Sequence, residues 1–416
     1  MLQLRKLLSF AALTLVVPPL CAQPLTLEEA LRAGEGQSPR LAAQRSMLSS
    51  AEHQIGRATE LPDPRLRLGI DNLPLTGEDR FRYDRDFMTM RSIGWMQDFP
   101  NAAKREARGV RAERTRDVEQ AMLSSQRAML QRDLALAWFE VYFAGRVREA
   151  LETLVRQFAA QADAVAAGVA RGKQTAAESF MLRGLVEQAR DRALDQERLI
   201  ARARAALEAF LGGDARRPLG APPDTAKLPQ RGETLLGRLG EHPQLRVYDQ
   251  REGLARAEAD LARTAKNSDW SLEVGYAQRR PAFSNMLSVM LAFELPWQAE
   301  RRQDRDIASR LAEIEQVRAQ REDARRMHEA ELRSWLADHE TATRRIERYR
   351  ASLLPLARER VSAALAAYQG GRGELASVLE AQRAVTETEL AMIAIEAERA
   401  KAWANLSFQY PHEVSR

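Results

Sequence analysis

Hydrophobic and polar residues follow two different periods along this chain. In short segments every second residue is apolar, which is the pattern of a β-strand with one apolar face. Such strands are expected at about 65–71, 87–99, 271–278 and 286–295. In long segments apolar residues recur every seven positions, as at Ala121, Ala128, Ala135 and Tyr142, and this spacing is typical of long helices that pack side by side. The two periods predict two strand pairs, each followed by a helical hairpin.

The first hairpin is expected over about 101–210 and the second over about 299–409. From Asn101 the chain runs for about 70 residues almost without helix breakers, which gives a rod roughly 100 Å long at 1.5 Å per residue. The second long helix is expected to run without interruption from about Ala299 to Tyr368.

The same order of elements occurs twice in the chain. Three landmarks match: Ser38-Pro39 with His242-Pro243, Phe99-Pro100 with Leu295-Pro296, and Arg171-Gly172 with Gly370-Gly371. The matching prolines lie 204 and 196 residues apart and the glycines 199 residues apart. A period this long is not that of a solenoid unit, so the pattern indicates a duplicated half-domain.

The predicted organisation is one elongated body preceded by an export signal. The boundaries are a signal peptide at 1–22, a first repeat at 23–211, a helix-free Pro/Gly-rich connector at 212–231, a second repeat at 232–410 and a tail at 411–416. Arg5 and Lys6 precede an apolar run of 11 residues, Leu7 to Val17, which is too short to span a bilayer as a helix.

Cys21 is the only cysteine, and it lies inside the predicted signal. Lipidation of Cys21 is the alternative, but Leu20 stands where a lipoprotein signal normally has a small residue. Without Cys21 the mature chain has no thiol, which excludes disulfides and cysteine metal sites.

Charge and motifs argue against nucleic-acid binding and catalysis. The formal charge is +5, and removal of Arg5 and Lys6 leaves +3, with no basic block among aromatic residues. The chain has no phosphate-binding glycine loop, no Gly-x-Ser-x-Gly and no His-Glu-x-x-His. No two histidines have the spacing of three or four that binds one metal. We therefore expect no enzyme activity, no cofactor and no resident metal.

Three methionines, Met88, Met90 and Met96, share one face of the second predicted strand. Thioethers suit Cu(I), but apolar packing is the preferred interpretation, because methionine is a common filler of apolar surfaces.

The strands have the length of tilted membrane strands. Four strands cannot close a barrel, and an open edge in lipid would leave backbone groups unpaired. Three identical chains would supply twelve strands, which is enough for a closed barrel with a lumen. The residues expected to face lipid are Leu66, Leu68, Ile70, Leu287, Val289, Leu291 and Phe293. The alternative is a soluble strand cap on a coiled-coil body.

The second hairpin resembles the outer membrane factors of the TolC family, and the resemblance covers essentially the whole mature chain. The resemblance rests on Tyr368-Gln369-Gly370-Gly371-Arg372-Gly373-Glu374-Leu375, followed by Val378-Leu379-Glu380-Ala381-Gln382-Arg383. The segments Asp71-Asn72-Leu73-Pro74, Phe87-Met88-Thr89-Met90 and Ile93 to Pro100 look like the heavy-metal branch, which serves cobalt-zinc-cadmium or copper-silver pumps.

The resemblance implies a mainly α fold with a small β part. A homotrimer would place twelve strands in the outer membrane of a Gram-negative cell and an α-barrel of long helices in the periplasm, where an adaptor protein and an inner-membrane pump of the RND type meet it. The periplasmic tips that dock the adaptor would be Gly168, Arg171, Gly172 and Lys173 in one hairpin and Gly370, Gly371, Arg372 and Gly373 in the other. The acidic constriction of the family corresponds to Ser377 and Glu380, of which only Glu380 is acidic.

The preferred function is therefore a passive exit duct of a tripartite efflux system that carries heavy-metal cations. One alternative is the same duct for drugs, other small molecules or secreted polypeptide, and another is a periplasmic coiled-coil scaffold.

Overall fold

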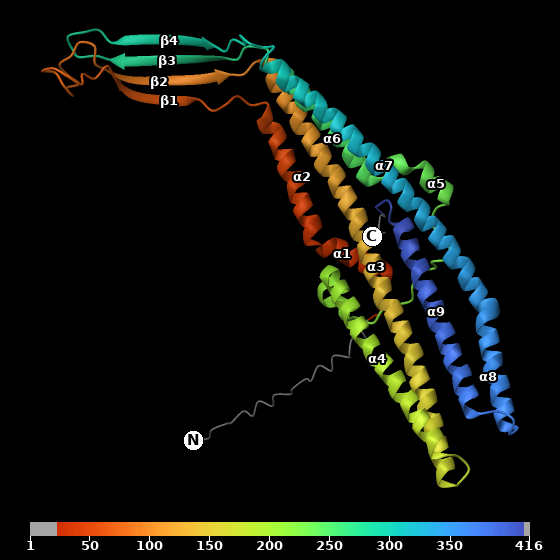
Figure 1. The fold of residues 1–416 in the computed structure, drawn as a ribbon. Helices are drawn as coiled ribbons and strands as arrows, with labels where there is room; N and C mark the ends of the chain where they lie inside the picture. Colours follow the sequence, from red (N-terminus) through yellow and green to blue (C-terminus); the bar gives the residue numbers. More distant parts are fainter. Residues whose placement is uncertain (1–22, 412–416) are drawn as a thin grey trace, which may run out of the picture. The chain divides into compact units, whose positions relative to one another are not determined.

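The computed structural model describes residues 23–411. The predicted signal peptide, with Cys21 and its lipidation alternative, and residues 412–416 lie outside the described residues. The fold is mainly α with four strands, as predicted (Figure 1). Two compact units form: the hairpin unit, residues 23–36, 134–225 and 345–397, and the sheet unit, residues 37–133, 226–344 and 398–411. Each unit therefore contains parts of both sequence repeats.

The sheet unit shows the duplication directly. Its first copy has α2 (Pro39–Ala58), β1 (Arg65–Asp71), β2 (Met90–Phe99) and the beginning of α3 (Ala102–Ala170). Its second copy follows α5 (Gly232–Gly237) and the short 3-10 helix η2 (Leu239–Glu241), and has α6 (Pro243–Thr264), β3 (Trp270–Gln278), β4 (Met286–Phe293) and α7 (Gln303–Arg348).

Matching caps start α2 and α6. Each of these two helices has a proline in its first turn, where the missing N–H is not needed. The Ser38 hydroxyl accepts a hydrogen bond from the Leu41 N–H, and Nδ1 of His242 accepts one from the Gln244 N–H. The two repeats thus use different side chains for the same local task.

Polar contacts place the helices of the sheet unit next to one another. Gln44 of α2 donates to the Glu119 carboxylate of α3 at 2.6 Å. Arg111 of α3 and Arg310 of α7 both donate to Glu258 of α6, at 3.1 and 3.2 Å. These bonds join α2 to α3, and α6 to both α3 and α7.

The hairpin unit holds the turns of both helical hairpins. It contains α1 (Leu27–Gln37), the end of α3, α4 (Ala176–Leu211), α8 (Leu354–Gln369) and the beginning of α9 (Leu375–Ser407). Its core joins three helices through the buried residues Leu154, Phe158 and Val165 of α3, Leu182, Val186 and Ala189 of α4, and Leu375 and Leu379 of α9. At the start of α1, Thr26 and Glu29 form a capping box, with bonds of 3.3 and 3.2 Å.

The second long helix is interrupted, contrary to the prediction. After α7 the segment η3 (Tyr349–Leu353) is π-helical, and α8 then continues to Gln369. Pro355 stands in the first turn of α8 and has no N–H to donate to the carbonyl four residues earlier. A π-turn just before the proline accommodates the lost hydrogen bond.

Two further boundaries differ from the sequence expectation. The connector is not free of helix, because Gly212–Arg216 forms the 3-10 helix η1, and Leu219 forms a parallel bridge with Leu25. β2 begins at Met90 rather than Phe87, because the Met88 N–H binds the Asp86 carboxylate at 2.6 Å and closes a turn there. In the described part of the chain, no helix is both long enough and apolar enough to cross a membrane.

Candidate functional site

The four strands form one antiparallel sheet in the order β1-β2-β3-β4, and its two faces differ in character. Residues directly opposite each other on neighbouring strands share a face. One row joins Leu68, Ile93, Tyr276 and Leu287, and the next joins Leu66, Trp95, Val274 and Val289. The remaining apolar residues of this face, which we call the apolar face, are Ile70, Phe99, Trp270, Leu272, Leu291 and Phe293.

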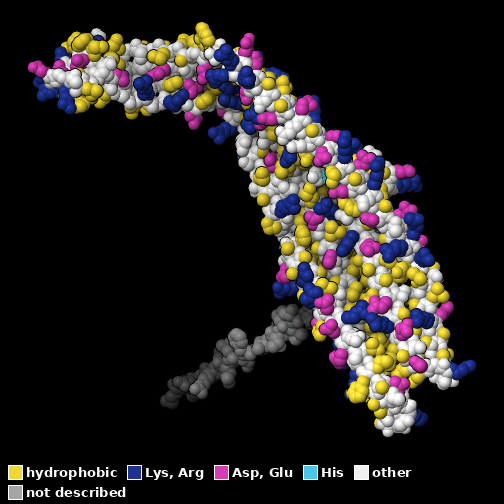
Figure 2. All heavy atoms as spheres, in the orientation of Figure 1, with side chains coloured by type: hydrophobic (Ala, Val, Ile, Leu, Met, Phe, Trp, Pro, Cys, Tyr) yellow, Lys and Arg dark blue, Asp and Glu magenta, His cyan; other side chains and the backbone are white. Residues whose placement is uncertain are grey.

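Large apolar side chains of this face are exposed in the single chain. Leu68 and Leu287 have 70% and 72% of their surface accessible. On the side of the sheet that Figure 2 shows, hydrophobic side chains alternate with charged ones. All the residues predicted to face lipid lie on this face. An exposed apolar surface of this kind calls for a covering partner.

Three polar residues interrupt the apolar face, and all lie near its ends. Gln97 is buried and donates to the Pro62 carbonyl at 2.7 Å. Arg91 and Gln278 form the last pair before the loops, where the Arg91 guanidinium lies 5.8 Å from the centre of the Tyr83 ring. The centre of the face is therefore free of charge.

The opposite face, which we call the polar face, carries charged and small residues. Its members are Arg65, Arg67, Gly69, Asp71, Met90, Ser92, Gly94, Met96, Asp98, Ser271, Glu273, Gly275, Ala277, Met286, Ser288, Met290 and Ala292. Arg65 pairs with Asp98 across β1 and β2, and Arg67 reaches Glu273 of β3 at 3.5 Å. A sheet with one apolar and one polar face suits a boundary between lipid and water.

A polar network fixes the helical end of the sheet. The Asp269 carboxylate accepts hydrogen bonds from the Asn101 N–H at 2.9 Å and from the Asn101 side chain at 2.8 Å, and it pairs with Lys104. Burial raises the pKa of Asp269, but the bonds from Lys104 and Asn101 outweigh it, so the pKa is lowered overall. Beside this network Phe99 and Trp270 stack with ring centres 4.1 Å apart.

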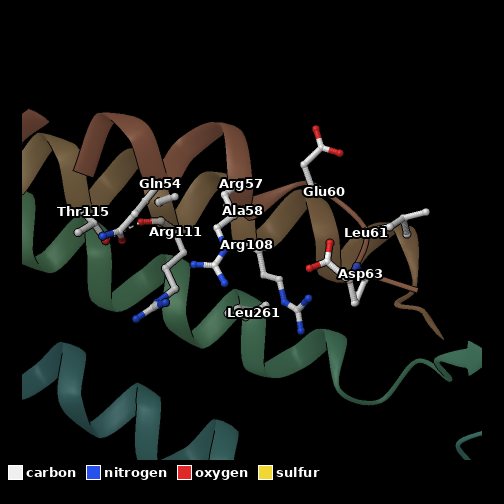
Figure 3. A pocket seen from close by; sticks show the side chains of 12 residues that line it. Gln54, Arg57, Ala58, Glu60, Leu61, Asp63, Arg108, Arg111, Thr115 and Leu261 are labelled. Carbon is white, nitrogen blue, oxygen red and sulfur yellow. Dashed lines mark hydrogen bonds between the residues drawn. The ribbon is translucent and has the colours of Figure 1, made fainter. Parts of the chain in front are cut away.

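An open pocket of about 780 Å³ lies among α2, α3 and α6 (Figure 3). Arg57, Arg108 and Arg111 line it, while the carboxylate of Glu60 points away from the arginines. Arg108 also lines a second pocket of about 470 Å³ at the end of the sheet. Sequence spacing did not indicate this arginine cluster, because α2 and α3 bring it together from distant segments.

The predicted tip residues occupy two equivalent turns of the hairpin unit. Gly172 and Gly371 have φ values of +69° and +68°, a left-handed conformation that favours glycine. Arg171, Lys173 and Arg372 are exposed at these turns. The Gln174 side chain donates to the Tyr368 hydroxyl at 2.9 Å, which links the two hairpins near their ends.

At two tip glycines an added side chain would come very close to neighbouring atoms. A Cβ at Gly168 would lie 2.2 Å from the Gln174 side chain, and one at Gly373 would lie 3.0 Å from the Tyr368 nitrogen. Both turns are thus built for close approach of the chain.

Ser377 and Glu380 lie one turn apart on the exposed side of α9, while Val378 and Leu379 face the core. Arg360 of α8 donates to the Glu380 carboxylate at 3.0 Å. Other acids along α9 are also bound by arginines of neighbouring elements: Glu387 by Arg192, Glu389 by Arg358 and Glu396 by Arg350. Glu380 therefore belongs to a series of ion pairs between helices.

The structure brings together two histidines that sequence spacing kept apart. The rings of His242, the N-cap residue of α6, and His328 of α7 lie 4.3 Å apart between centres, and Glu331 lies 3.2 Å from Nδ1 of His328. Burial lowers the pKa of His242 to about 3, with further contributions from His328 and Arg132. Among residues 23–411, no group of three or more His, Cys, Asp or Glu side chains is arranged to hold a metal ion.

The whole chain can be compared with proteins of known sequence and structure. No family model matches the sequence. The cobalt-zinc-cadmium resistance protein CzcC of Cupriavidus metallidurans is 26% identical over 402 residues, which cover 91% of this chain and 88% of that protein.

Two solved structures of membrane proteins share the fold of this chain over nearly its whole length. A membrane protein from Pseudomonas aeruginosa matches with a TM-score of 0.77 and 19% identity, covering 92% of this chain and 93% of that one. The CmeC outer membrane channel of Campylobacter jejuni matches with a TM-score of 0.77 and 13% identity, covering 94% and 87%. The predicted fold class and the predicted resemblance to TolC-type outer membrane factors are confirmed.

Proposed function

We propose that this chain is one third of an outer-membrane exit duct that serves a tripartite efflux system. The observation that carries the proposal is the two-faced sheet. Its apolar face is suited to outer-membrane lipid, and its polar face is suited to a water-filled lumen. The shared fold with a known outer membrane channel supports this location.

The open edges of the sheet support a trimer. In the order β1-β2-β3-β4, the outer edges of β1 and β4 have no partner strand within the described chain. Such edges are not tolerated in lipid. Pairing of β4 with β1 of the next copy would satisfy them, and three copies would close a twelve-stranded barrel.

The preferred cargo is heavy-metal cations, and the printed name of the CzcC relative supports this choice. Drugs, other small molecules or secreted polypeptide through the same duct remain the alternative. A coiled-coil scaffold outside the membrane is the third reading, but it gives no role to the exposed apolar face. In none of these readings does the chain catalyse a reaction.

The two tip turns are proposed to dock the periplasmic adaptor, which connects the duct to an inner-membrane pump of the RND type. The exposed Arg171, Lys173 and Arg372 would bind acidic groups of that adaptor. Ser377 and Glu380 are proposed to line the constriction. Three copies of Glu380 would place a ring of carboxylates there. Arg360 donates to each carboxylate and partly balances its charge, so the ring favours cations over anions only by the part of the charge that Arg360 leaves unbalanced.

Fractionation of the cell envelope tests the duct. We expect the mature protein in the outer-membrane fraction as a trimer that resists SDS without heating. A deletion strain is then compared with the complemented strain for sensitivity to zinc, cobalt, cadmium, copper and silver. A soluble monomer would refute the duct, whereas an intact trimer without any metal phenotype would refute only the metal cargo.

A matched pair of variants tests the constriction. Glu380→Gln keeps the size of the side chain and removes its charge, and Glu374→Gln removes an exposed acid near the tip that lacks the Arg360 contact. We expect Glu380→Gln to reduce the cation preference of single channels in a planar bilayer, and Glu374→Gln to change it less. Equal effects of the two variants would contradict the assignment of Glu380.

A further inference from the structure

Methionines are distributed unevenly between the two faces of the sheet. The polar face carries four of them, Met90, Met96, Met286 and Met290, and it has no Leu, Ile, Val, Phe, Tyr or Trp. On the apolar face the reverse holds, because its large side chains are Leu, Ile, Val, Phe, Tyr and Trp and it has no methionine.

Met90 and Met96, for which apolar packing was predicted, are half-buried and lie on the polar face. A methionine that serves only as an apolar filler should occur among leucines and valines, but both residues lie on the polar face. Met88 precedes the first residue of β2 and is not part of the strand. The side chains of Met286 and Met290 are 50% and 60% exposed, so they fill no core within the chain.

Register arranges the four methionines in two levels. In the lower level, nearer the helices, Met96 and Met290 flank Glu273 from either side in one row across β2, β3 and β4. The upper level spans two rows. Met286 lies opposite Ala277, in the row of Ser92, and Met90 lies one row closer to the loops, opposite Asp71 of β1. At roughly 3.3 Å per residue, Met286 and Met290 are about 13 Å apart along β4, and Met90 and Met96 are about 20 Å apart along β2.

We propose that these methionines are weak binding sites for soft monovalent metal cations, Cu(I) or Ag(I), on their way through the barrel. The inference rests on the proposed function, since only a closed barrel makes the polar face the wall of a lumen. Thioether sulfur is a neutral, soft ligand that favours Cu(I) over harder ions. Glu273 adds a carboxylate between the two lower thioethers, with its charge partly balanced by Arg67.

Two levels of weak sites suit passage better than one tight site. Conduction requires that an ion bind well enough to enter and weakly enough to leave, and neighbouring sites assist this exchange. In a trimer the lower level would present six thioethers in one row around the lumen, and the upper level would present two successive rows of three. The upper level, next to the loops, would receive ions from the lower one.

Oxidation footprinting of the purified trimer tests the sites one by one. Hydrogen peroxide converts accessible methionines to sulfoxides, and peptide mass spectrometry reports the rate at each position with and without silver nitrate or zinc sulfate. We expect silver to slow oxidation of Met90, Met96, Met286 and Met290, and zinc to leave it unchanged. Met47 of α2 and Met327 of α7, which are 51% and 57% exposed, are the internal controls.

A variant carrying Met→Leu at all four positions tests the consequence in cells. Leucine keeps the size and apolar character of methionine and is usually well tolerated. We expect this variant to form the trimer and to lose silver and copper tolerance in the complemented deletion strain, while a Met47→Leu, Met327→Leu variant keeps that tolerance.

The outcomes separate the two proposals. An intact trimer in which silver leaves the four rates unchanged, or slows oxidation at Met47 and Met327 equally, overturns this inference alone. Failure to find any trimer in the outer membrane overturns the proposed function and this inference with it. Protection of the four methionines together with the selective loss of silver tolerance supports both.

Discussion

Replacement of His242 by asparagine should change how the stability of the protein depends on pH. His242 lies between α6 and α7 and is faced by His328 and Glu331 of α7, Arg132 of α3 and the ring of Tyr410. Its pKa is lowered from 6.5 to about 3, first by burial and then by the nearby His328 and Arg132. The folded protein therefore holds this imidazole neutral at pH values where an unfolded chain protonates it.

The direction and the size of the change in stability with pH follow from the different proton binding of the folded and unfolded chain. Because the folded pKa lies below the unfolded pKa, the unfolded chain binds the extra proton as pH falls below 6.5, so stability decreases. At pH 5 the unfolded chain is 1.5 units below its pKa, and each unit corresponds to about 1.4 kcal/mol. His242 should thus cost each protomer about 2 kcal/mol at pH 5 relative to pH 7.5.

Asparagine is a suitable replacement, because it is a good N-cap residue and can accept the bond from the Gln244 N–H in place of Nδ1. Free energies of unfolding would be measured at both pH values by guanidinium denaturation in detergent, followed by circular dichroism. The loss between pH 7.5 and pH 5 should be smaller in His242→Asn than in the wild type by about 2 kcal/mol per protomer.

The control is His53→Asn, which removes an exposed histidine from α2. It should leave the pH dependence of the wild type unchanged. If His242→Asn loses as much stability on acidification as the wild type, then His242 is protonated in the folded protein and the reasoning fails.

Three further changes test the sheet, the core and the tips. Val289→Arg places a charge on the apolar face and should destabilise the barrel in the bilayer by about 2–4 kcal/mol, so gels of outer membranes should show less trimer. The control Ser288→Arg, on the polar face of the same strand, should leave the amount of trimer unchanged. Phe158→Ala opens a cavity in the core of the hairpin unit, where the side chain is 2% exposed, and should destabilise by about 3–5 kcal/mol; Phe180→Ala, 70% exposed, should leave the thermal midpoint nearly unchanged. Gly371→Ala forces an L side chain to φ +68° and should lower the free energy of unfolding by about 1–2 kcal/mol. The control Gly36→Ala, whose new Cβ meets no atom within 4 Å, should not destabilise the protein. Equal thermal midpoints for the two variants would contradict a strained turn at Gly371.

Much of the fold could be predicted because its signals are local and occur twice. Alternation identified the strands, and the two tip glycines, 199 residues apart, have nearly the same positive φ. The heptad spacing continues across Pro355, so periodicity alone predicts an uninterrupted second long helix. A proline in an otherwise regular pattern interrupts the hydrogen bonds of a helix even where the heptad spacing continues.

The pairs that define the candidate site were less accessible to sequence reasoning. His242 and His328 meet because α6 and α7 each turn one particular side toward the other, and Glu380 meets Arg360 for the same reason. Periodicity shows that a helix has an apolar stripe, but it does not show which polar residues at the margins of two stripes will touch. Periodicity likewise does not show that the arginines around Arg108 lie close together.

The functional assignment depends most on strand register, because a slip of one residue exchanges the faces of a strand. A slip of β2 would move Trp95 and Ile93 to the polar face and Met96 and Asp98 to the apolar one. Polar contacts oppose such a slip at two places. Asp98 of β2 pairs with Arg65 of β1, and Asn101, just after β2, is bound to Asp269, just before β3. Since Asp269 also holds Lys104, a slip would break several charged hydrogen bonds at once. The network at the helical end of the sheet therefore keeps apolar side chains on one face and thioethers and charges on the other, which is the property that a wall between lipid and a lumen requires.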